Sequence, residues 1–272
     1  PFELHLSTHL PGDVWVVELR QPAAIATKPY YEANPGETFR LPLNARVTLL
    51  APYRLDESIP ASKRLWLARL TLPLPRDEYL AQYGFPIRYN YVPRAWPSEY
   101  YQTVYATEPG SAEMPSAGRA FTSDLMTRLT AHGIVFAPLV LHTGVASLEA
   151  HEPLYEEYYR VPPSTARLVN ETHESGKRVI AVGTTVVRAL ETVTDENGVT
   201  NSGEGWTRLV IRADHRMRAV DGMLTGWHEP KATHLAMLES LAGAEPLALA
   251  YHEALARGYL WHEFGDLHLI LP

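Results

Sequence analysis

The period of the hydrophobic pattern changes near Glu99, and this change restricts the possible folds more than any other feature of the chain. Before Glu99, short segments alternate apolar and polar residues or run apolar over a few positions, which is typical of strands. After Glu99, apolar runs of strand length alternate with segments of helical period, which is typical of a sheet covered by helices. We therefore predict an α/β protein that consists of a large mixed α/β domain and a smaller all-β, barrel-like domain.

The same pattern gives the predicted domain boundaries. Residues 1–73 form the small β domain, residues 74–98 a connector rich in proline and tyrosine, and residues 99–272 the large α/β domain. The strands predicted in the β domain are residues 2–6, 14–19, 46–50 and 65–70. The helices predicted in the α/β domain are residues 122–132, 162–176, 185–194, 230–243 and 246–257. Its predicted strands are residues 134–141, 178–182, 206–211 and 267–271.

Composition excludes several classes of function. The 272 residues include no cysteine, so disulfides, thiolate catalysis and cysteine-ligated zinc are excluded. A net charge of −7 argues against a sequence-independent nucleic-acid binder, but it permits an enzyme that holds a folded RNA through one basic patch. No apolar run approaches the roughly 20 residues of a membrane helix, and no signal-peptide pattern opens the chain, so we expect a cytoplasmic protein without a membrane partner. The metal-binding pattern His-Glu-x-x-His does not occur, so we predict no bound metal. Dinucleotide and phosphate-loop patterns do not occur either, which argues against dinucleotide- and nucleoside-triphosphate-dependent enzymes.

The turn Val182-Gly183-Thr184-Thr185 is the most informative local motif. An apolar strand leads into Gly183, where a backbone without a Cβ can approach a ligand closely. Thr184 or Thr185 is predicted to cap the helix that follows, whose free N–H groups and dipole favour an anion such as a carboxylate or phosphate. Arg188 lies near the start of this helix and either pairs with Glu191 or reaches an anionic ligand. An ordinary strand-to-helix connection is the alternative interpretation of the whole turn.

A second motif is the loop at residues 221–231, which places Asp221, two glycines, His228 and Lys231 between a strand and a helix. Loops of this composition often carry function. His228 is a candidate acid or base because the unperturbed pKa of histidine is near neutral. The alternative is a hairpin turn at Asp221-Gly222 followed by a plain helix start.

Short motifs follow one another in a fixed order from about residue 100 to the C-terminus. They include YQTVYA at 101–106, PGS at 109–111, PSAG at 115–118, FT at 121–122, LHTG at 141–144, VIAVGTTVVRALE at 179–191, GWTRL at 205–209, the loop 221–231, Tyr259, and FGD at 264–266. In order and spacing, these motifs resemble the S-adenosylmethionine:tRNA ribosyltransferase-isomerase family of queuosine biosynthesis. The resemblance covers roughly two-thirds of the chain.

The resemblance implies a fold and a reaction. The small β domain would be inserted into the large domain, and a further N-terminal segment of the large domain would precede Pro1, so we expect the chain to be part of a longer protein. The implied enzyme transfers ribose from S-adenosylmethionine to the aminomethyl group of a 7-deazaguanine at the tRNA wobble position and isomerises it, with release of adenine and methionine. The implied partners are therefore tRNA and S-adenosylmethionine, the latter as a substrate, with no metal and no obligate protein partner.

The resemblance also implies roles for particular residues. Proton abstraction from the carbon beside the sulfonium requires a general base, and His228 and His142 are the acid/base candidates. Asp221 and Asp266 would contact the ribose or the amine. The residues implied in substrate binding are Gly183, Thr184, Thr185, Arg188, Gly118, Gly144 and Lys231.

Departures from the family pattern lie mainly in the motif loops. A family histidine between Gly118 and Phe121 is absent here, and Ala146-Ser147-Leu148 replaces Gly-Thr-Phe. Other replacements are Gly226-Trp227 for Asn-Phe, Glu229 for leucine, and Leu267-His268 for Ala-Met. Two alternatives therefore stay open, a paralogue that acts on a small-molecule acceptor and a non-catalytic RNA-binding protein.

Overall fold

The computed structural model describes residues 2–23, 27–54, 61–62, 64–88, 92, 94–145, 155–229, 232 and 234–272. Its contacts divide the chain into two compact units. The first, here called the β unit, comprises Pro1–Ser98, Pro109–Glu113 and His142–Glu156. The second, here called the α/β unit, comprises Glu99–Glu108, Met114–Leu141 and Glu157–Pro272. Two segments that follow residue 98 thus belong to the β unit.

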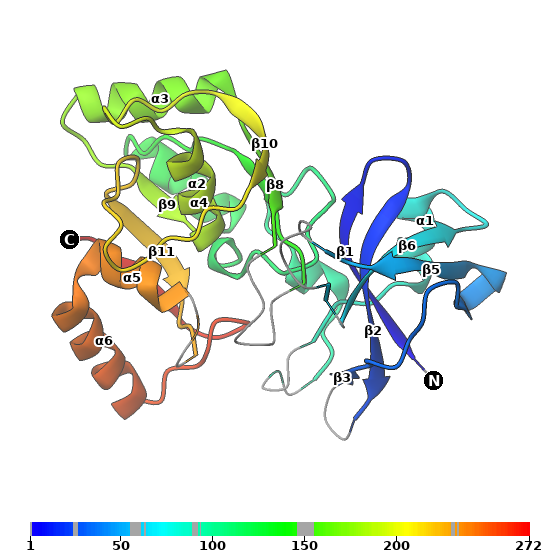
Figure 1. Ribbon diagram of the computed structural model, residues 1–272. Helices are drawn as coiled ribbons and strands as arrows, with labels where there is room; N and C mark the ends of the chain where they lie inside the picture. The colour runs from blue at the N-terminus through cyan, green and yellow to red at the C-terminus, as the bar shows by residue number, and fades with distance from the viewer. Residues whose placement is uncertain are drawn as a thin grey trace. The chain divides into compact units, whose positions relative to one another are not determined.

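The β unit is built on one antiparallel sheet with the strand order β1-β2-β6-β5-β4, and β3 pairs with β2 (Figure 1). Its strands are β1 (Glu3–Leu10), β2 (Val14–Pro22), β3 (Thr27–Pro29), β4 (Thr38–Arg40), β5 (Arg46–Pro52) and β6 (Leu65–Thr71), and one helix follows, α1 (Arg76–Tyr83). Among the described residues β1 and β4 do not pair with each other, so the barrel-like closure that we predicted is not confirmed. The three residues of β4 give the sheet a short edge at that end.

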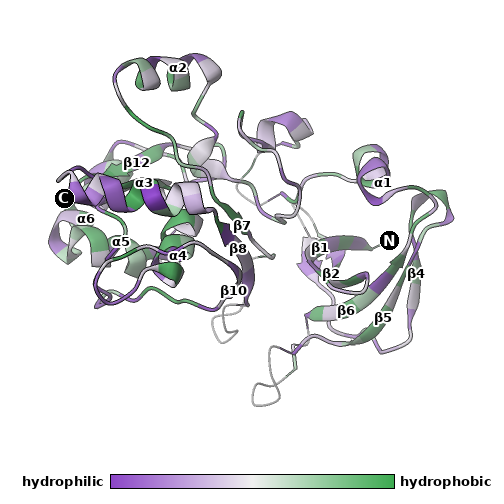
Figure 2. Ribbon diagram, turned by 90° about the horizontal axis from the view of Figure 1, so that it is seen from above, coloured by the Kyte–Doolittle hydropathy of each residue, from purple (hydrophilic) through white to green (hydrophobic). Residues whose placement is uncertain are grey.

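Alternation along the strands explains the core of the β unit. On β5, Val47 and Leu49 are fully buried while Arg46 and Leu50 are exposed, as the two-residue period of a strand requires. The buried side chains pack with Val17, Leu19, Trp66 and Ala68 of the neighbouring strands. Green, hydrophobic stretches accordingly mark β5 and β6 in Figure 2.

The α/β unit contains two three-stranded sheets. One has the order β10-β8-β7 and the other the order β12-β11-β9. Their strands are β7 (Val140–His142), β8 (Glu157–Val161), β9 (Ile180–Val182), β10 (Gly203–Thr207), β11 (Gly222–Gly226) and β12 (Leu267–Ile270). The helices of the unit are α2 (Ser123–Ala131), α3 (Pro163–Glu174), α4 (Thr184–Val193), α5 (His234–Ala242) and α6 (Ala244–Ala256). The fold is therefore mixed α/β, as predicted, with mostly antiparallel pairing.

The parallel pairing of β9 with β11 positions the candidate site. Val182 lies opposite Leu224, so the carboxyl ends of both strands meet at one edge of the sheet. Helix α4 begins directly after Gly183, which follows β9, and residues 227–229 follow β11 at the same edge. The core beneath includes Ala181, Val187, Leu190, Met223 and Leu238.

Several predicted elements in this unit are present. Helix α2 is capped by Thr122, whose hydroxyl oxygen accepts a hydrogen bond from the Leu125 N–H at 3.1 Å. Helix α3 follows Pro162, as predicted. Helix α4 is also present, but Gly183 rather than a threonine occupies its N-cap position, and no side chain caps it. No helix among the described residues is long and apolar enough to cross a membrane.

Other elements differ from the prediction. Residues 134–141 are not one buried strand, because only β7 forms there and Ile134 and Val135 are exposed. Pro138 interrupts this apolar run and cannot donate a ladder hydrogen bond. Strand β10 ends at Thr207, four residues earlier than predicted. Helix α5 is described from His234 onward, and Pro230, where we predicted its start, lies outside the described residues.

Candidate active site

The start of helix α4 has the geometry of an anion site. Gly183 adopts φ 97° and ψ 150°, a conformation that residues with a Cβ avoid, and its N–H donates to the Leu224 carbonyl at 2.8 Å. Gly183 is therefore held against β11 and has no side chain to cap the helix that follows. Thr184 is buried and Thr185 half-buried at this start, where the first N–H groups of a helix have no intrahelical acceptor.

Arg188 lies one turn further along α4 and is 8% exposed. Its Nε donates to the Leu209 carbonyl at 3.0 Å, and its Nη1 forms an ion pair with Glu157 at the start of β8. Its Nη2 is buried and has no hydrogen-bond partner in the described part of the chain. An unsatisfied buried donor on a cation is costly, so such a group is a strong candidate for binding an anionic ligand.

His228, in the loop after β11, is buried at 6% exposure. Its Nε2 lies 3.0 Å from the Thr225 hydroxyl, and its backbone N–H donates to the Tyr251 hydroxyl at 3.2 Å. Burial lowers the pKa of His228 to about 2, with smaller contributions from the charges of neighbouring histidines. The imidazole is consequently neutral across the physiological range.

Two further histidines surround His228 and, with it, form what we call the histidine cluster. The ring of His234, on α5, stacks on His228 with 4.5 Å between centroids, and the ring of His262 lies 5.2 Å from His228. Burial lowers the pKa of His234 to about 4, and the charges of His262 and Arg188 add to this effect. Arg188 therefore belongs to the same neighbourhood as the histidine cluster.

A carboxylate lies beside the cluster. Glu229 Oε2 is 3.6 Å from His262 Nδ1. Burial lowers the pKa of His262, and the negative charge of Glu229 opposes that shift. The backbone N–H of His262 also donates to the Trp227 carbonyl at 2.8 Å, which ties the segment before β12 to the loop after β11.

Close packing at Gly226 fixes the position of His262. A Cβ at residue 226 would overlap the Cβ of His262 and lie 2.8 Å from its Cα, so the two backbones meet here without room for a side chain. Next to this contact, Trp227 stacks on His268 with centroids 4.2 Å apart and planes 5° from parallel. Gly226, Trp227, Glu229 and His268 all depart from the family pattern, and these contacts show that the departures lie together.

The carboxylates of Asp221 and Asp266 both accept hydrogen bonds from backbone N–H groups. Asp221 Oδ2 accepts from the Val179 N–H at 2.8 Å and lies 3.1 Å from His173 Nε2. Asp266 is exposed, and its Oδ2 accepts from the Leu260 N–H at 2.8 Å. These bonds hold the starts of β9 and of β12 in place.

The other predicted site residues divide between the two units. Gly118, in the α/β unit, is buried, and a Cβ there would meet the Tyr105 hydroxyl. His142 and Gly144 belong to the β unit. The His142 ring packs on Gly110, and a Cβ on Gly144 would lie 2.8 Å from Ser7 Oγ. Lys231 lies outside the described residues.

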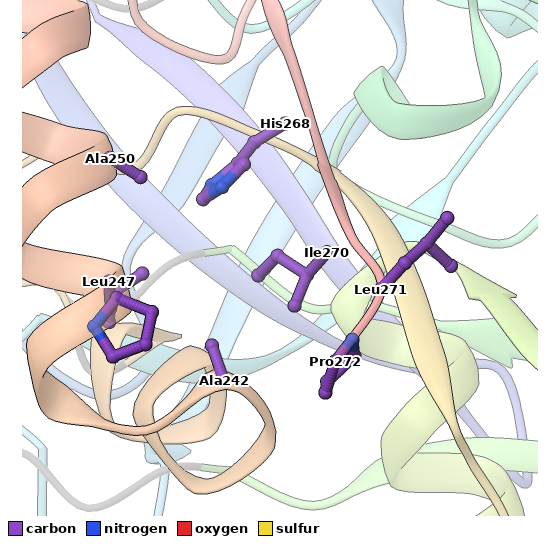
Figure 3. Close-up of a pocket in the computed structure, with 8 residues that line it drawn as sticks. Ala242, Leu247, Ala250, His268, Ile270, Leu271 and Pro272 are labelled. Carbon is purple, nitrogen blue, oxygen red and sulfur yellow. The ribbon is translucent and has the colours of Figure 1, made fainter.

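An apolar pocket of about 220 Å³ opens between α5, α6 and β12. In Figure 3, His268 and Ile270 project to the same side of their strand, toward Leu247 and Ala250. None of the residues of the histidine cluster lines this pocket, and neither does Arg188. Its apolar lining does not suit a charged ligand.

Four members of the site were not predicted from sequence, namely Glu157, Thr225, His234 and His262. Thr225 stands three residues before His228, a spacing that can place two side chains together in a turn. Glu157, His234 and His262 come from a strand, a helix and the segment before the last strand. Only the tertiary fold brings them to Arg188 and His228.

Comparison with known proteins identifies the family of this chain. The family described as "Queuosine biosynthesis protein" matches residues 3–270. The chain belongs to this family, which confirms the resemblance read from its motifs.

Curated relatives carry the name S-adenosylmethionine:tRNA ribosyltransferase-isomerase. The protein of Symbiobacterium thermophilum is 44% identical over 180 residues, which cover 64% of this chain and 53% of the relative. That of Desulfitobacterium hafniense is 39% identical over 204 residues, covering 72% of this chain and 60% of the relative. The matches thus span little more than half the length of these relatives. A crystal structure of S-adenosylmethionine tRNA ribosyltransferase from Thermotoga maritima is 26% identical, with a TM-score of 0.48, and covers 99% of this chain and 75% of that chain.

Proposed function

We propose that this chain carries the site of an S-adenosylmethionine-dependent tRNA ribosyltransferase-isomerase. In this reaction the ribose of S-adenosylmethionine is transferred to the aminomethyl group of 7-deazaguanine at the tRNA wobble position and isomerised to an epoxycyclopentanediol, with release of adenine and methionine. The names of the relatives support this proposal. The observation that carries it is the buried Nη2 of Arg188, without a hydrogen-bond partner among the described residues, on a helix whose start has no side-chain cap.

The methionine carboxylate of S-adenosylmethionine is the anion that suits this position. A guanidinium binds a carboxylate through charge-assisted hydrogen bonds, and a helix start adds N–H donors and a favourable dipole. In the proposal, Arg188 Nη2 and the N–H groups of Thr184 and Thr185 bind the carboxylate, while Gly183 lets the ligand approach the backbone. Glu157 and the Leu209 carbonyl hold the guanidinium so that Nη2 is directed to the ligand.

The family resemblance implies roles for the remaining site residues. His228 is a neutral imidazole at the edge of the site, and His142 is the second acid/base candidate. Asp266 precedes β12 at the edge where β11 ends, and we propose that it binds the ribose or the amine. Asp221 precedes β11 at the opposite edge of the sheet, away from Gly183 and His228, which does not favour the role predicted for it. The resemblance also implies that Gly118, Gly144 and Lys231 bind substrate. We further propose that the protein acts in the cytoplasm.

A second candidate function has an observation in its favour. Trp227 Nε1 and His268 Nδ1 are both buried with no hydrogen-bond partner in the described residues, and both side chains depart from the family pattern. Buried polar atoms of this kind favour a ligand that supplies their missing partners. This favours a paralogue that keeps the donor S-adenosylmethionine and acts on a different, small-molecule acceptor.

One incubation separates the candidates. The protein is mixed with S-adenosylmethionine and tRNA that bears 7-aminomethyl-7-deazaguanine, and adenine release and RNA modification are both measured. The main proposal predicts both products. Adenine release without RNA modification would identify the paralogue, and RNA binding without either product would identify a non-catalytic RNA-binding protein. No adenine release overturns the main proposal.

A further inference from the structure

We propose that His262, positioned by Glu229, is the general base that removes the proton from the carbon beside the sulfonium. This inference rests on the proposed function, because it assigns one step of that reaction to a residue. In the step, a C–H bond breaks and an N–H bond forms on the imidazole. The electron pair stays on the carbon, where the adjacent positive sulfur stabilises it.

Accessibility distinguishes His262 from the other two histidines of the cluster. The side chain of His262 is 21% exposed and that of its partner Glu229 is 36% exposed. His228 is 6% exposed, with Nε2 beside the Thr225 hydroxyl, and burial lowers its pKa to about 2. A base must reach the substrate and then hold a proton, and His228 does neither readily.

Backbone contacts fix the position of His262. Its backbone N–H donates to the Trp227 carbonyl at 2.8 Å, and its Cα and Cβ pack against Gly226. Its ring lies 5.2 Å from the His228 ring. A catalytic group needs such rigid support, because small displacements reduce the rate strongly.

The charge of Glu229 helps His262 to accept a proton. The carboxylate oxygen lies 3.6 Å from Nδ1, so it stabilises the imidazolium that forms when the ring accepts a proton. Before the reaction, burial lowers the pKa of His262, which keeps the ring in its neutral, proton-accepting form at pH 7. Within the described residues, the other titratable or charged groups around the pair are His228, His234, Arg188, Tyr251, Glu263 and His268.

Matched substitutions test the assignment through the pH dependence of adenine release. We expect His262→Gln to lower kcat by at least about 100-fold, the usual size of a lost general base, and to remove the acid limb of the profile. Glu229→Gln removes a charge that raises the pKa of His262, so its acid limb moves to lower pH and kcat falls about 10-fold. The controls His252→Gln and Glu174→Gln change exposed residues on α6 and α3 and leave the profile unchanged.

Exchange of hydrogen for deuterium reports the proton transfer itself. In D₂O, the unsubstituted protein should exchange deuterium into the carbon beside the sulfonium of S-adenosylmethionine, and His262→Gln should not. If the unsubstituted protein turns over and His262→Gln stays within about threefold of it with the same acid limb, the base assignment is overturned.

Failure of the proposed function gives a different result. If the unsubstituted protein releases no adenine, NMR titration of the histidine rings still tests the pair. Glu229→Gln should lower the pKa of His262, whereas Glu174→Gln should not. An unchanged pKa in Glu229→Gln overturns the role of Glu229 without reference to turnover.

Discussion

Each of the two units contains a buried arginine that pairs with a glutamate. Among the described residues, the two arginines differ in whether Nη2 has a hydrogen-bond partner. In the β unit, Arg20 is 9% exposed and uses all three nitrogens, with Nη1 on Glu18, Nε on the Thr27 hydroxyl at 2.7 Å and Nη2 on the Thr27 carbonyl at 2.7 Å. In the α/β unit, Arg188 is 8% exposed, with Nη1 paired with Glu157 and Nε donating to the Leu209 carbonyl at 3.0 Å. Its Nη2 has none among the described residues.

The difference separates a structural ion pair from a functional one. A buried guanidinium with every nitrogen bonded rigidifies its surroundings and offers nothing to a ligand. A buried guanidinium held by two nitrogens, with the third unsatisfied, carries an energetic cost that a bound anion would remove. Substitutions at the two pairs should therefore affect different quantities, stability in the β unit and ligand affinity in the α/β unit.

The largest effect is expected on stability, from Glu18→Leu. Glu18 is 1% exposed and pairs with both Arg20 and Arg64, whose Nη1 donates to it at 2.8 Å. Loss of the carboxylate leaves two buried arginines without it, which should lower the free energy of unfolding by about 3–5 kcal/mol in urea titrations. Glu32→Leu, at an exposed position, is the control and should stay within about 0.5 kcal/mol. A loss below about 1 kcal/mol for Glu18→Leu would contradict the structural role of the pair.

The pH dependence of stability should reflect the charges of Arg20 and Arg64, because both act on the nearby His5. Burial lowers the pKa of His5 to about 4, and the charges of Arg20 and Arg64 act in the same direction. A folded-state pKa below the unfolded value of about 6.5 stabilises the protein above that pH, and the contribution is lost as the pH falls toward 4. A shift of this size corresponds to about 3 kcal/mol. Urea midpoints at pH 7.5 and 4.5 should therefore differ less in His5→Gln than in the unsubstituted protein, and an equal difference would refute the shift.

Ligand affinity should respond only in the α/β unit. Arg188→Lys keeps the positive charge beside Glu157 but cannot serve Glu157, the Leu209 carbonyl and a carboxylate together, because lysine lacks the guanidinium fork. One lost charge-assisted hydrogen bond, about 1.5–3 kcal/mol, corresponds to a rise of roughly 10- to 100-fold in the Kd for S-adenosylmethionine by calorimetry. Arg20→Lys should lower the melting temperature and leave this Kd unchanged. Equal effects of both substitutions on Kd would remove the distinction between the two pairs.

The sequence predicted those elements that interactions between residues close in the chain determine. Helix α2, with Thr122 at its start and Gly133 after its end, and the turn at Gly183 were predictable, because caps and glycine turns act within a few residues. The single strand predicted over residues 134–141 is wrong because apolar composition outweighed the effect of Pro138. Closure of the β sheet depends on pairing between distant strands, which no local pattern specifies.

The candidate site follows the same division. Arg188 and His228 were identified because they lie in motifs, a helix start and a loop before a helix. His262 and Glu157 could not be identified, since their importance comes from packing on Gly226 and from pairing with Arg188. The near-neutral pKa expected of His228 also changed, because burial cannot be read from a single histidine in a loop.

The smallest effect is expected from glycine-to-alanine substitutions, which test whether the backbone at the start of α4 contacts the ligand. Gly183→Ala places a Cβ where the nearest atoms are 3.5 Å and 3.7 Å away, so it meets no steric block, but φ 97° is strained for alanine by about 1–2 kcal/mol. Gly133→Ala, at φ 85° after α2 and with no atom near its Cβ, should cost a similar amount in thermal unfolding. Relaxation at residue 183 also turns the N–H groups of Thr184 and Thr185, so only Gly183→Ala should weaken binding of S-adenosylmethionine, by a few-fold. If both variants lose stability equally and neither changes the Kd, the start of α4 does not contact the ligand, and the anion site reduces to Arg188 alone.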